Sequence, residues 1–349
     1  MPRNLLNKQE IETLRALMCG EGKVVIVCHM SPDGDALGSS LCLWNLLRDS
    51  GRTANVVVPD MPPHNLSFLP GYDEITVASC HPERAGRLAA EASLIFCLDF
   101  NDFARIDRLA PAITESGAVK VMIDHHLNPV AEVDLRISHP EISSTCALLY
   151  LVLEQAGLTS RLSREAAECC CTGMMTDTGN FSYNSNDPEL YRILSHLMET
   201  GIDKDAIYTR LFNTNSVSRV RIMGYGQSAK MQLFPEHQAA LITLSRVELN
   251  EFDYHRGDTE ALVNVPLSIP SVTYSVFLRE DEENYVKVSM RSKGDFSVKD
   301  ICEKHFSGGG HINAAGGEMR RPLAEVVARL IEVMPDYDCR LPENKTNQI

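Results

Sequence analysis

Short apolar runs alternate with helical patterns through the N-terminal part of the chain. Apolar runs of this length are typical of buried strands. They occur without a break at 24–28 and 94–98, and with one polar residue each at 54–58 and 119–123. Apolar residues recur at helical spacing in the segments 7–19, 41–47, 83–91, 144–156, 163–175, 190–200 and 204–212. Strands that alternate with helices predict an α/β fold, in which a parallel sheet is covered by helices on both faces.

The pattern changes in the C-terminal part of the chain. Strand-like composition appears at 239–244, 271–278 and 285–291, and helical patterns appear at 298–305 and 323–334. This mixture predicts a smaller α+β domain, with the helical stretch at 217–231 as its link to the first. We therefore expect a first domain over residues 1–215, a linker helix over 216–231, a second domain over 232–343 and a disordered tail over 344–349.

Aspartate or histidine stands immediately after three of the predicted strands, and a further acidic loop follows the helix at 163–175. The residues concerned are His29, Asp33, Asp35, Asp99, His125, His126 and Asp177, and Asp124 stands directly before His125. Ligands bind at the carboxyl edge of such parallel sheets, so we expect these side chains to meet in one crevice. A single aspartate at a strand end is more often a turn or cap residue. The recurrence in four segments is what favours a shared site.

Carboxylates and imidazoles in this number indicate a metal site. Four carboxylates with two or three imidazoles are too many for one cation and suit two divalent ions about 3.5–4 Å apart that share a bridging carboxylate. Oxygen-rich ligands with some imidazole favour Mn²⁺ or Mg²⁺, although zinc or cobalt also fits. Two such ions bind phosphate and activate water, so the residues indicate hydrolysis of a phosphate ester. For Asp124 we expect a role in orienting an adjacent histidine rather than ligation.

The segment SGGGHINAAGG at 307–317 suggests a second binding site. Three consecutive glycines let the backbone approach a ligand and offer amide donors to an anion, and His311 follows them directly. Arg291, just past a predicted strand, suits bidentate phosphate recognition. Between residues 287 and 321 there are seven Lys or Arg and four Asp or Glu, a local charge of +3 in a chain of −14. The alternative for the glycines is a flexible loop.

The overall composition argues against several classes of function and of cellular location. A net charge of −14 argues against a protein that coats long nucleic acid, but not against one that binds a short anionic substrate in a locally positive cleft. No apolar run is long enough to span a bilayer, and residues 1–31 lack a signal-peptide pattern. The eleven cysteines contain no CxxC pair, which indicates reduced thiols and a cytoplasmic protein.

The motifs also resemble a known family. HMSPDGD (29–35), the strand end at Asp99, DHH (124–126) and TDTG (176–179) resemble, in order, the four motifs of the DHH phosphoesterase superfamily. SGGGHINAAGG resembles the signature of its DHHA1 substrate-binding domain. The resemblance covers nearly the whole chain. It is strongest to the bifunctional oligoribonuclease and 3′-phosphoadenosine-5′-phosphate (PAP) phosphatase group, the nanoRNases.

The resemblance implies a role for each site residue. By that likeness the ligands of one metal are His29, Asp33 and Asp99, and those of the other are Asp35, Asp99, His125 and Asp177, with Asp99 as the bridge. His126 is expected to contact the substrate phosphate, so that His126 and Asp99 are the expected catalytic residues. The residues expected to grip the nucleotide are Arg291, Gly309, Gly310 and His311.

The function implied by the resemblance is a cytoplasmic hydrolase that uses two divalent ions, with Mn²⁺ preferred over Mg²⁺ or Co²⁺. It is expected to cleave RNA only a few nucleotides long to 5′-mononucleotides and to convert PAP to AMP. The expected partners are short RNA or nucleotide bisphosphates, and neither long nucleic acid nor a membrane is expected. A homodimer is expected only because homodimers are common among soluble proteins. Two alternatives stay open: a phosphodiesterase for cyclic di-AMP or linear pApA, and a non-catalytic nucleotide-binding regulator. The intact metal set speaks against the regulator.

Overall fold

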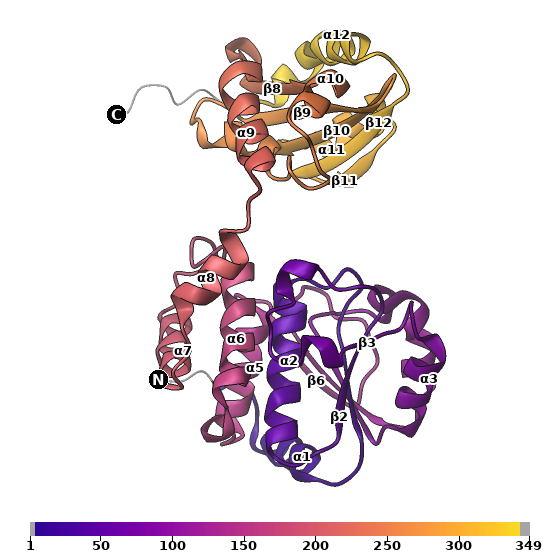
Figure 1. Cartoon of the computed structure of the whole chain (residues 1–349), viewed down its shortest axis with the longest axis vertical. Coiled ribbons are helices and arrows are strands. Elements are labelled where there is room, and N and C mark those ends of the chain that lie inside the picture. Colours follow the sequence, from indigo (N-terminus) through magenta and orange to yellow (C-terminus); the bar gives the residue numbers. More distant parts are fainter. Residues whose placement is uncertain (1–3, 343–349) are drawn as a thin grey trace. The chain divides into compact units, whose positions relative to one another are not determined.

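The computed structural model of the protein describes residues 4–342 (Figure 1). The chain forms two compact units, Met1–Thr214 and Asn215–Ile349. Each contains its own six-stranded sheet and its own hydrophobic core. The tail predicted to be disordered, 344–349, lies outside the described residues.

The first unit is built on a parallel sheet. Its strands are β1 (Val24–Val27), β2 (Ala54–Val58), β3 (Thr76–Val77), β4 (Leu94–Leu98), β5 (Val119–Asp124) and β6 (Leu135–Ser138). They lie in the order β3-β2-β1-β4-β5-β6, and every neighbouring pair is parallel. The predicted α/β fold is therefore confirmed. The strand order reverses between β1 and β4, which is where such sheets place their ligands.

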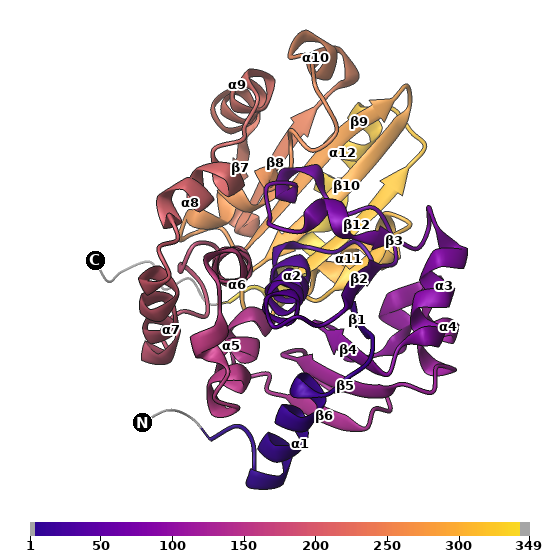
Figure 2. The ribbon, with the colours of Figure 1, turned by 60° about the horizontal axis from the view of Figure 1, so that its bottom comes forward.

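Helices cover both faces of this sheet. They are α1 (Lys8–Cys19), α2 (Gly34–Asp49), α3 (Pro82–Glu91), α4 (Ala110–Thr114), α5 (Thr145–Gln155), α6 (Arg164–Asp177), α7 (Pro188–Glu199) and α8 (Lys204–Phe212). Figure 2 shows α2, α5 and α6 on one side of the strands and α3 and α4 on the other. Alternate residues of β1 serve the two faces: Val24 and Ile26 pack in the core under α2, α5 and α6, whereas Val25 and Val27 pack with residues of α3 and α4. This is why the strand is apolar throughout.

The second unit is a mixed sheet with helices, as the predicted α+β domain requires. Its strands are β7 (Gln232–Phe234), β8 (Ala239–Leu244), β9 (Tyr274–Glu282), β10 (Tyr285–Ser292), β11 (Gly309–His311) and β12 (Ala314–Met319). Their order is β11-β12-β10-β9-β8-β7, antiparallel except for the pair β8–β9. Its helices are α9 (Val217–Tyr225), α10 (Arg246–Glu251), α11 (Val298–His305) and α12 (Leu323–Val333). In the core, the rings of Tyr274 and Phe296 stack 4.7 Å apart.

The segment expected to form a linker helix is divided in the structure. Its first part is α9, and a π-helical turn, Gly226–Lys230, follows directly. Ile222 is buried in a cluster that also contains Ile242 and Leu262. A hydrogen bond from the hydroxyl of Ser218 to Asp258 (2.6 Å) adds a polar contact. These contacts make the segment part of the second unit.

The glycine-rich segment at 307–317 is ordered as two strands rather than as a flexible loop. β11 and β12 pair antiparallel, with Gly310 opposite Ala315. Gly310 has a φ of 139°, and a Cβ there would lie 2.5 Å from the carbonyl oxygen of Ala314. A Cβ at Gly308 would overlap the backbone at Gly316. The hairpin itself therefore requires two of the three glycines.

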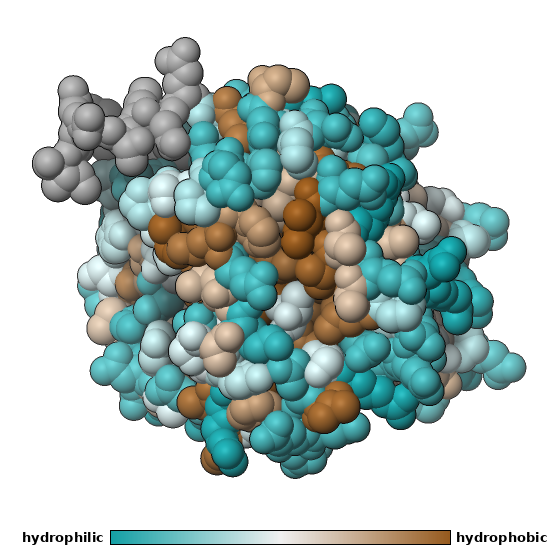
Figure 3. Space-filling model, turned by 90° about the horizontal axis from the view of Figure 1, so that it is seen from above, coloured by the Kyte–Doolittle hydropathy of each residue, from teal (hydrophilic) through white to brown (hydrophobic). Residues whose placement is uncertain are grey.

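The polarity of the surface is mixed. Figure 3 shows one face of the molecule, on which hydrophobic residues gather towards the middle and hydrophilic residues surround them. Among the described residues, no helix combines the length and the apolar character needed to cross a membrane.

Candidate metal centre

The structure gathers the sequence-predicted acidic and histidine residues at the carboxyl edge of the parallel sheet. His29 follows β1, Asp99 follows β4, and His125 and His126 follow β5. Asp33 is the N-cap of α2, Asp35 lies in its first turn, and Asp177 is the last residue of α6. The loops after β1, β4 and β5 thus meet the start of α2 and the end of α6 at one site, although the residues are spread over 149 positions of the chain.

Two groups of three side chains are placed so that each could hold a cation. The first is His29, Asp33 and Asp99, and the second is Asp35, His125 and Asp177, with the potential ligand atoms of each group within 4.8 Å of one another. Asp99 belongs to the first group and also faces the second. Its Oδ2 lies 3.3 Å from Nε2 of His29, and its Oδ1 lies 3.7 Å from Nε2 of His125. A carboxylate that presents one oxygen to each group has the geometry of a bridge.

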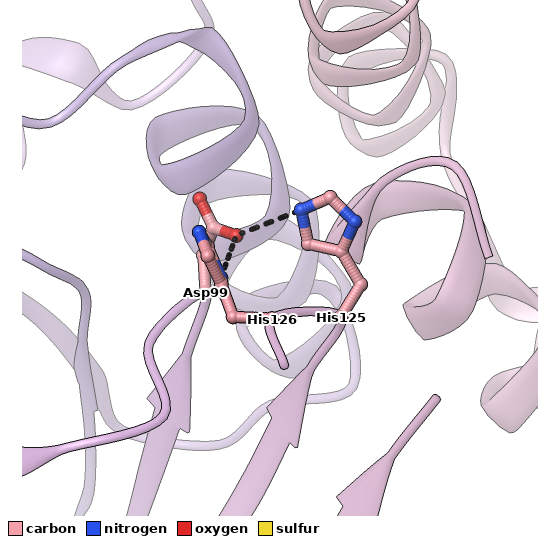
Figure 4. Close-up of side chains that lie close together, drawn as sticks. All are labelled: Asp99, His125 and His126. Carbon is pink, nitrogen blue, oxygen red and sulfur yellow. Dashed lines mark ion pairs between the residues drawn. The ribbon is translucent and has the colours of Figure 1, made fainter. Parts of the chain in front are cut away.

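The third group is Asp99, His125 and His126, drawn in Figure 4. Both rings turn toward the carboxylate of Asp99, and Nδ1 of His126 lies 3.7 Å from its Oδ1. The fully buried Asp124 accepts hydrogen bonds from Nδ1 of His126 (2.7 Å) and from its backbone N–H (3.1 Å). Asp124 thus fixes the orientation of this ring and lies behind it.

Backbone carbonyls set the protonation of the two imidazoles that face the carboxylates. Nδ1 of His29 donates to the carbonyl of Met30 (2.7 Å), and Nδ1 of His125 donates to the carbonyl of Ile142 (3.1 Å). A carbonyl can only accept, so Nδ1 carries the proton in both rings. Nε2 is then the atom left to bind a cation, and it is the atom that points at the carboxylates.

The N-terminus of α5 holds two of the carboxylates in place. Asp35 accepts from the backbone N–H of Thr145 (2.6 Å) and from that of Cys146 (2.9 Å). The hydroxyl of Thr145 donates to Oδ1 of Asp99 (2.8 Å). Thr145 is not among the residues predicted from the sequence, because a threonine after Ser144 looks like the start of any capped helix.

Close packing of α2 against α6 brings Asp35 and Asp177 together. A Cβ at Gly38 would lie 2.6 Å from the carbonyl oxygen of Cys169, and a Cβ at Gly173 would lie 2.8 Å from Oδ1 of Asp35. Only glycine fits at these two positions without movement of a helix. The sequence gives a glycine at each but does not show which helix lies opposite.

The electrostatics of the site favour a bound cation. Burial raises the pKa of Asp35 well above its usual range, and the charges of Asp99 and Asp177 raise it further. Burial would by itself lower the pKa of His125, but the hydrogen bond to Asp177 and the charges of the neighbouring carboxylates raise it to about 10. In both shifts the neighbouring carboxylates contribute in the direction expected for crowded negative charge, which a divalent cation would neutralise. Oxygen ligands with imidazole nitrogens are a donor set that Mn²⁺ and Mg²⁺ accept.

In the second unit, Arg291 and His311 flank the same position of the sheet. Both are paired in register with Ala314, Arg291 from β10 and His311 from β11. Neighbouring strands lie about 4.8 Å apart, so the two backbones are roughly 10 Å apart on either side of β12. The guanidinium of Arg291 donates a hydrogen bond to the carbonyl of Met290 (2.9 Å). Gly309 and Gly310 precede His311 in the edge strand β11, and Arg291 lies two strands further in, so the four residues expected to grip a nucleotide lie across three neighbouring strands of this sheet.

Two family models match the chain. The model of the DHH family, N-terminal domain, matches residues 23–174, and the model of the DHHA1 domain matches residues 239–337. The first match contains every predicted metal ligand except Asp177, and the second contains the four predicted nucleotide-binding residues.

Individual relatives match over most of the chain. A bifunctional oligoribonuclease and PAP phosphatase, NrnA of Thermus thermophilus, is 31% identical over 93% of this chain and 91% of its own length. The cyclic-di-AMP phosphodiesterase GdpP of Geobacillus thermodenitrificans is 24% identical over 93% of this chain but only 49% of its own length. The solved structure of an exopolyphosphatase-related protein from Bacteroides fragilis is 43% identical, with a TM-score of 0.86, and covers 97% of this chain and 99% of that one.

These matches confirm the resemblance drawn from the four motifs and the glycine-rich segment. The chain belongs to the DHH–DHHA1 family of phosphoesterases, in the group of the bifunctional oligoribonucleases and PAP phosphatases.

Proposed function

We propose that this protein is a two-metal hydrolase that degrades very short RNA to 5′-mononucleotides and removes the 3′-phosphate of PAP. The observation that carries the proposal is Asp99, which presents one oxygen to each of two ligand groups. The substrates are those named for the Thermus relative, which aligns with nearly the whole of this chain.

The proposed ligand sets follow the two groups. One cation is held by His29, Asp33 and Asp99, and the other by Asp35, Asp99, His125 and Asp177. We propose Mn²⁺ as the cation, with Mg²⁺ or Co²⁺ as substitutes. When bound, the pair supplies positive charge for the phosphate and lowers the pKa of an attacking water.

Side chains around the cations position the substrate. Asp124 holds His126 by Nδ1, so Nε2 is left to donate to a phosphate oxygen when the ring is protonated. In the second unit, Arg291 and His311 are proposed to bind a second anionic group of the substrate, with amide donors from Gly309 and Gly310. His126 therefore acts on the reacting phosphate, and the four residues of the second unit on binding.

The cellular setting is part of the proposal. All eleven cysteines are free thiols, and most of them are buried. Such a set suits a reducing compartment, and we place the protein in the cytoplasm. We also propose that it acts as a homodimer and on neither long nucleic acid nor membranes, in keeping with its net charge of −14.

The test is a substrate panel with the purified protein and Mn²⁺. The panel contains a 5′-labelled dinucleotide, a slightly longer oligomer, a long RNA, PAP and cyclic di-AMP. We expect rapid loss of the short RNAs and of PAP, and slow loss of the long RNA. Preferential loss of cyclic di-AMP would instead assign the activity named for GdpP, and turnover of none of the five would favour a nucleotide-binding regulator.

A further inference from the structure

A cavity of about 760 Å³ adjoins the metal centre. Both histidines that follow β5, His125 and His126, line it, together with residues of the loops before α5 and after α6. Its size is within the range of small-molecule sites, roughly 300–1,000 Å³. A phosphate at the metal centre would place the sugar and base attached to it within reach of this space.

An apolar side chain lies on one wall, and hydrogen bonds tie the backbone that carries it. Leu127 follows His126 directly and is 70% exposed. Its carbonyl accepts a hydrogen bond from Nδ2 of Asn101 (2.7 Å), and the carbonyl of Asn101 accepts from the backbone N–H groups of Val130 (2.9 Å) and Ala131 (3.0 Å). Asn101, two residues after Asp99, therefore ties the loop that carries Leu127 to the strand that carries the bridging carboxylate.

The remaining walls suit an uncharged, hydrogen-bonding ligand, since they also hold two carboxylates, Glu141 and Asp187, which would repel a further phosphate. Pro140 adds a second apolar surface, and Asn184 and Asn186 add side-chain amides, which can both donate and accept. None of the described residues that line the cavity is Lys or Arg. A further phosphate would find no Lys or Arg there, whereas a base and a ribose would find apolar surface and amide partners.

We propose that this cavity binds the nucleoside on one side of the scissile phosphate, with Leu127 packed against the face of its base. The assignment rests on the proposed function and extends it, because it names residues that determine which part of a dinucleotide is recognised beside the metal centre. Asn184 and Asn186 bond the edge of the base or the ribose hydroxyls, and Asn101 is a positioning residue for Leu127.

The test compares Leu127→Ala with the wild-type protein, both loaded with Mn²⁺, on three substrates. One is a dinucleotide, and the other two carry an abasic residue in place of either nucleoside. Loss of apolar contact in the cavity should lower kcat/KM for the dinucleotide roughly tenfold. One abasic analogue should be at least as poor a substrate for the wild-type protein as the dinucleotide is for Leu127→Ala. Leu127→Ala should cost nothing more on that analogue, since its contact with the base is already lost.

Val130→Ala is the matched control. Val130 lies on the same loop and is 61% exposed, but it does not line the cavity, so its kcat/KM should be unchanged. An equal loss for Leu127→Ala on all three substrates, or no loss on any, would overturn the inference and leave the proposed function standing. If the wild-type protein cleaves no dinucleotide, the proposed function itself fails and the inference fails with it.

Discussion

Asp99 combines burial, a position between the two ligand groups and an unusual backbone conformation. It is almost completely buried, it faces both ligand groups, and its backbone has a φ of 63°, in the left-handed region that aspartate and asparagine tolerate better than most residues. Asparagine is therefore the substitution that keeps both the shape and the backbone conformation. It removes the charge and one of the two equivalent oxygens.

We expect Asp99→Asn to lower turnover of PAP by more than roughly a hundredfold, since a ligand should matter at least as much as the groups that orient it. Circular dichroism should show an unchanged fold, and metal analysis should show less bound Mn²⁺. Near-normal turnover would contradict the bridging role of Asp99.

Thr145 offers a test of how the carboxylates are held. Thr145→Val keeps the shape of the side chain but removes the donor to Oδ1 of Asp99. We expect Mn²⁺ affinity, measured by calorimetric titration, to fall roughly 10- to 100-fold. Thr145→Ser retains the hydroxyl and should bind Mn²⁺ nearly as the wild type does. Equal affinities for the valine and serine variants would show that the hydroxyl has no such role.

The sequence identified the site better than it identified the supports of the site. His29, Asp99 and His125 could be predicted because each stands just after an apolar run, and the end of a run marks the edge of a parallel sheet. Thr145 could not, because its contact with Asp99 depends on the direction in which α5 approaches that edge. No local pattern reports that direction.

At the scale of elements, the distance between α2 and α6 controls the site. A Cβ at Gly173 would overlap the sulfur of Cys146 and press on the carboxylate of Asp35. We expect Gly173→Ala to lower the free energy of unfolding by about 1–3 kcal/mol, the usual cost of overpacking, and to weaken Mn²⁺ binding. Urea unfolding and metal titration would measure the two effects.

Gly86 provides the control for that substitution. It lies in the middle of α3, where a Cβ would meet nothing within 4 Å. Gly86→Ala should therefore stabilise the protein by up to about 1 kcal/mol through helix propensity and leave metal binding unchanged. If both variants showed the same change in the free energy of unfolding and in Mn²⁺ binding, the close contact at Gly173 would have no effect on the site.

Three of the strands that were not predicted, β6, β11 and β12, lack the local signals of a strand. β6 carries the residues LRIS, which alternate between buried and exposed positions at the edge of the sheet, so no continuous apolar run marks it. The glycine-rich strands β11 and β12 lack the branched side chains that usually indicate a strand. β12 pairs with the edge of β10, and β11 pairs with β12, so the pairing depends on information that lies outside the segment.

At the scale of the whole molecule, all the proposed metal ligands belong to the first unit. Metal binding should therefore stabilise that unit selectively. With free Mn²⁺ at about 100 times its Kd, the gain is about 2.7 kcal/mol. In a calorimetric scan we expect Mn²⁺ to raise the transition of the first unit and EDTA to reverse the change, with the transition of the second unit unmoved. Equal shifts of both transitions would place cation binding elsewhere.

The second unit should affect binding rather than chemistry. We expect Arg291→Ala and His311→Ala to raise KM for PAP with kcat nearly unchanged, because contacts remote from the reacting phosphate bind substrate and transition state alike. Lys287→Ala is the control, since Lys287 is a basic residue on the same strand that lies near Asp281 instead. A loss confined to kcat would contradict the proposed grip.

The order of the two units along the chain matters for biosynthesis. The proposed ligands lie between His29 and Asp177, and the second unit begins only at Asn215. Domains generally fold in sequence as a nascent chain leaves the ribosome. We therefore expect the first unit to present the proposed cation site while the second is still being translated, and truncated translation products that end near the boundary to bind divalent cations as the finished chain does.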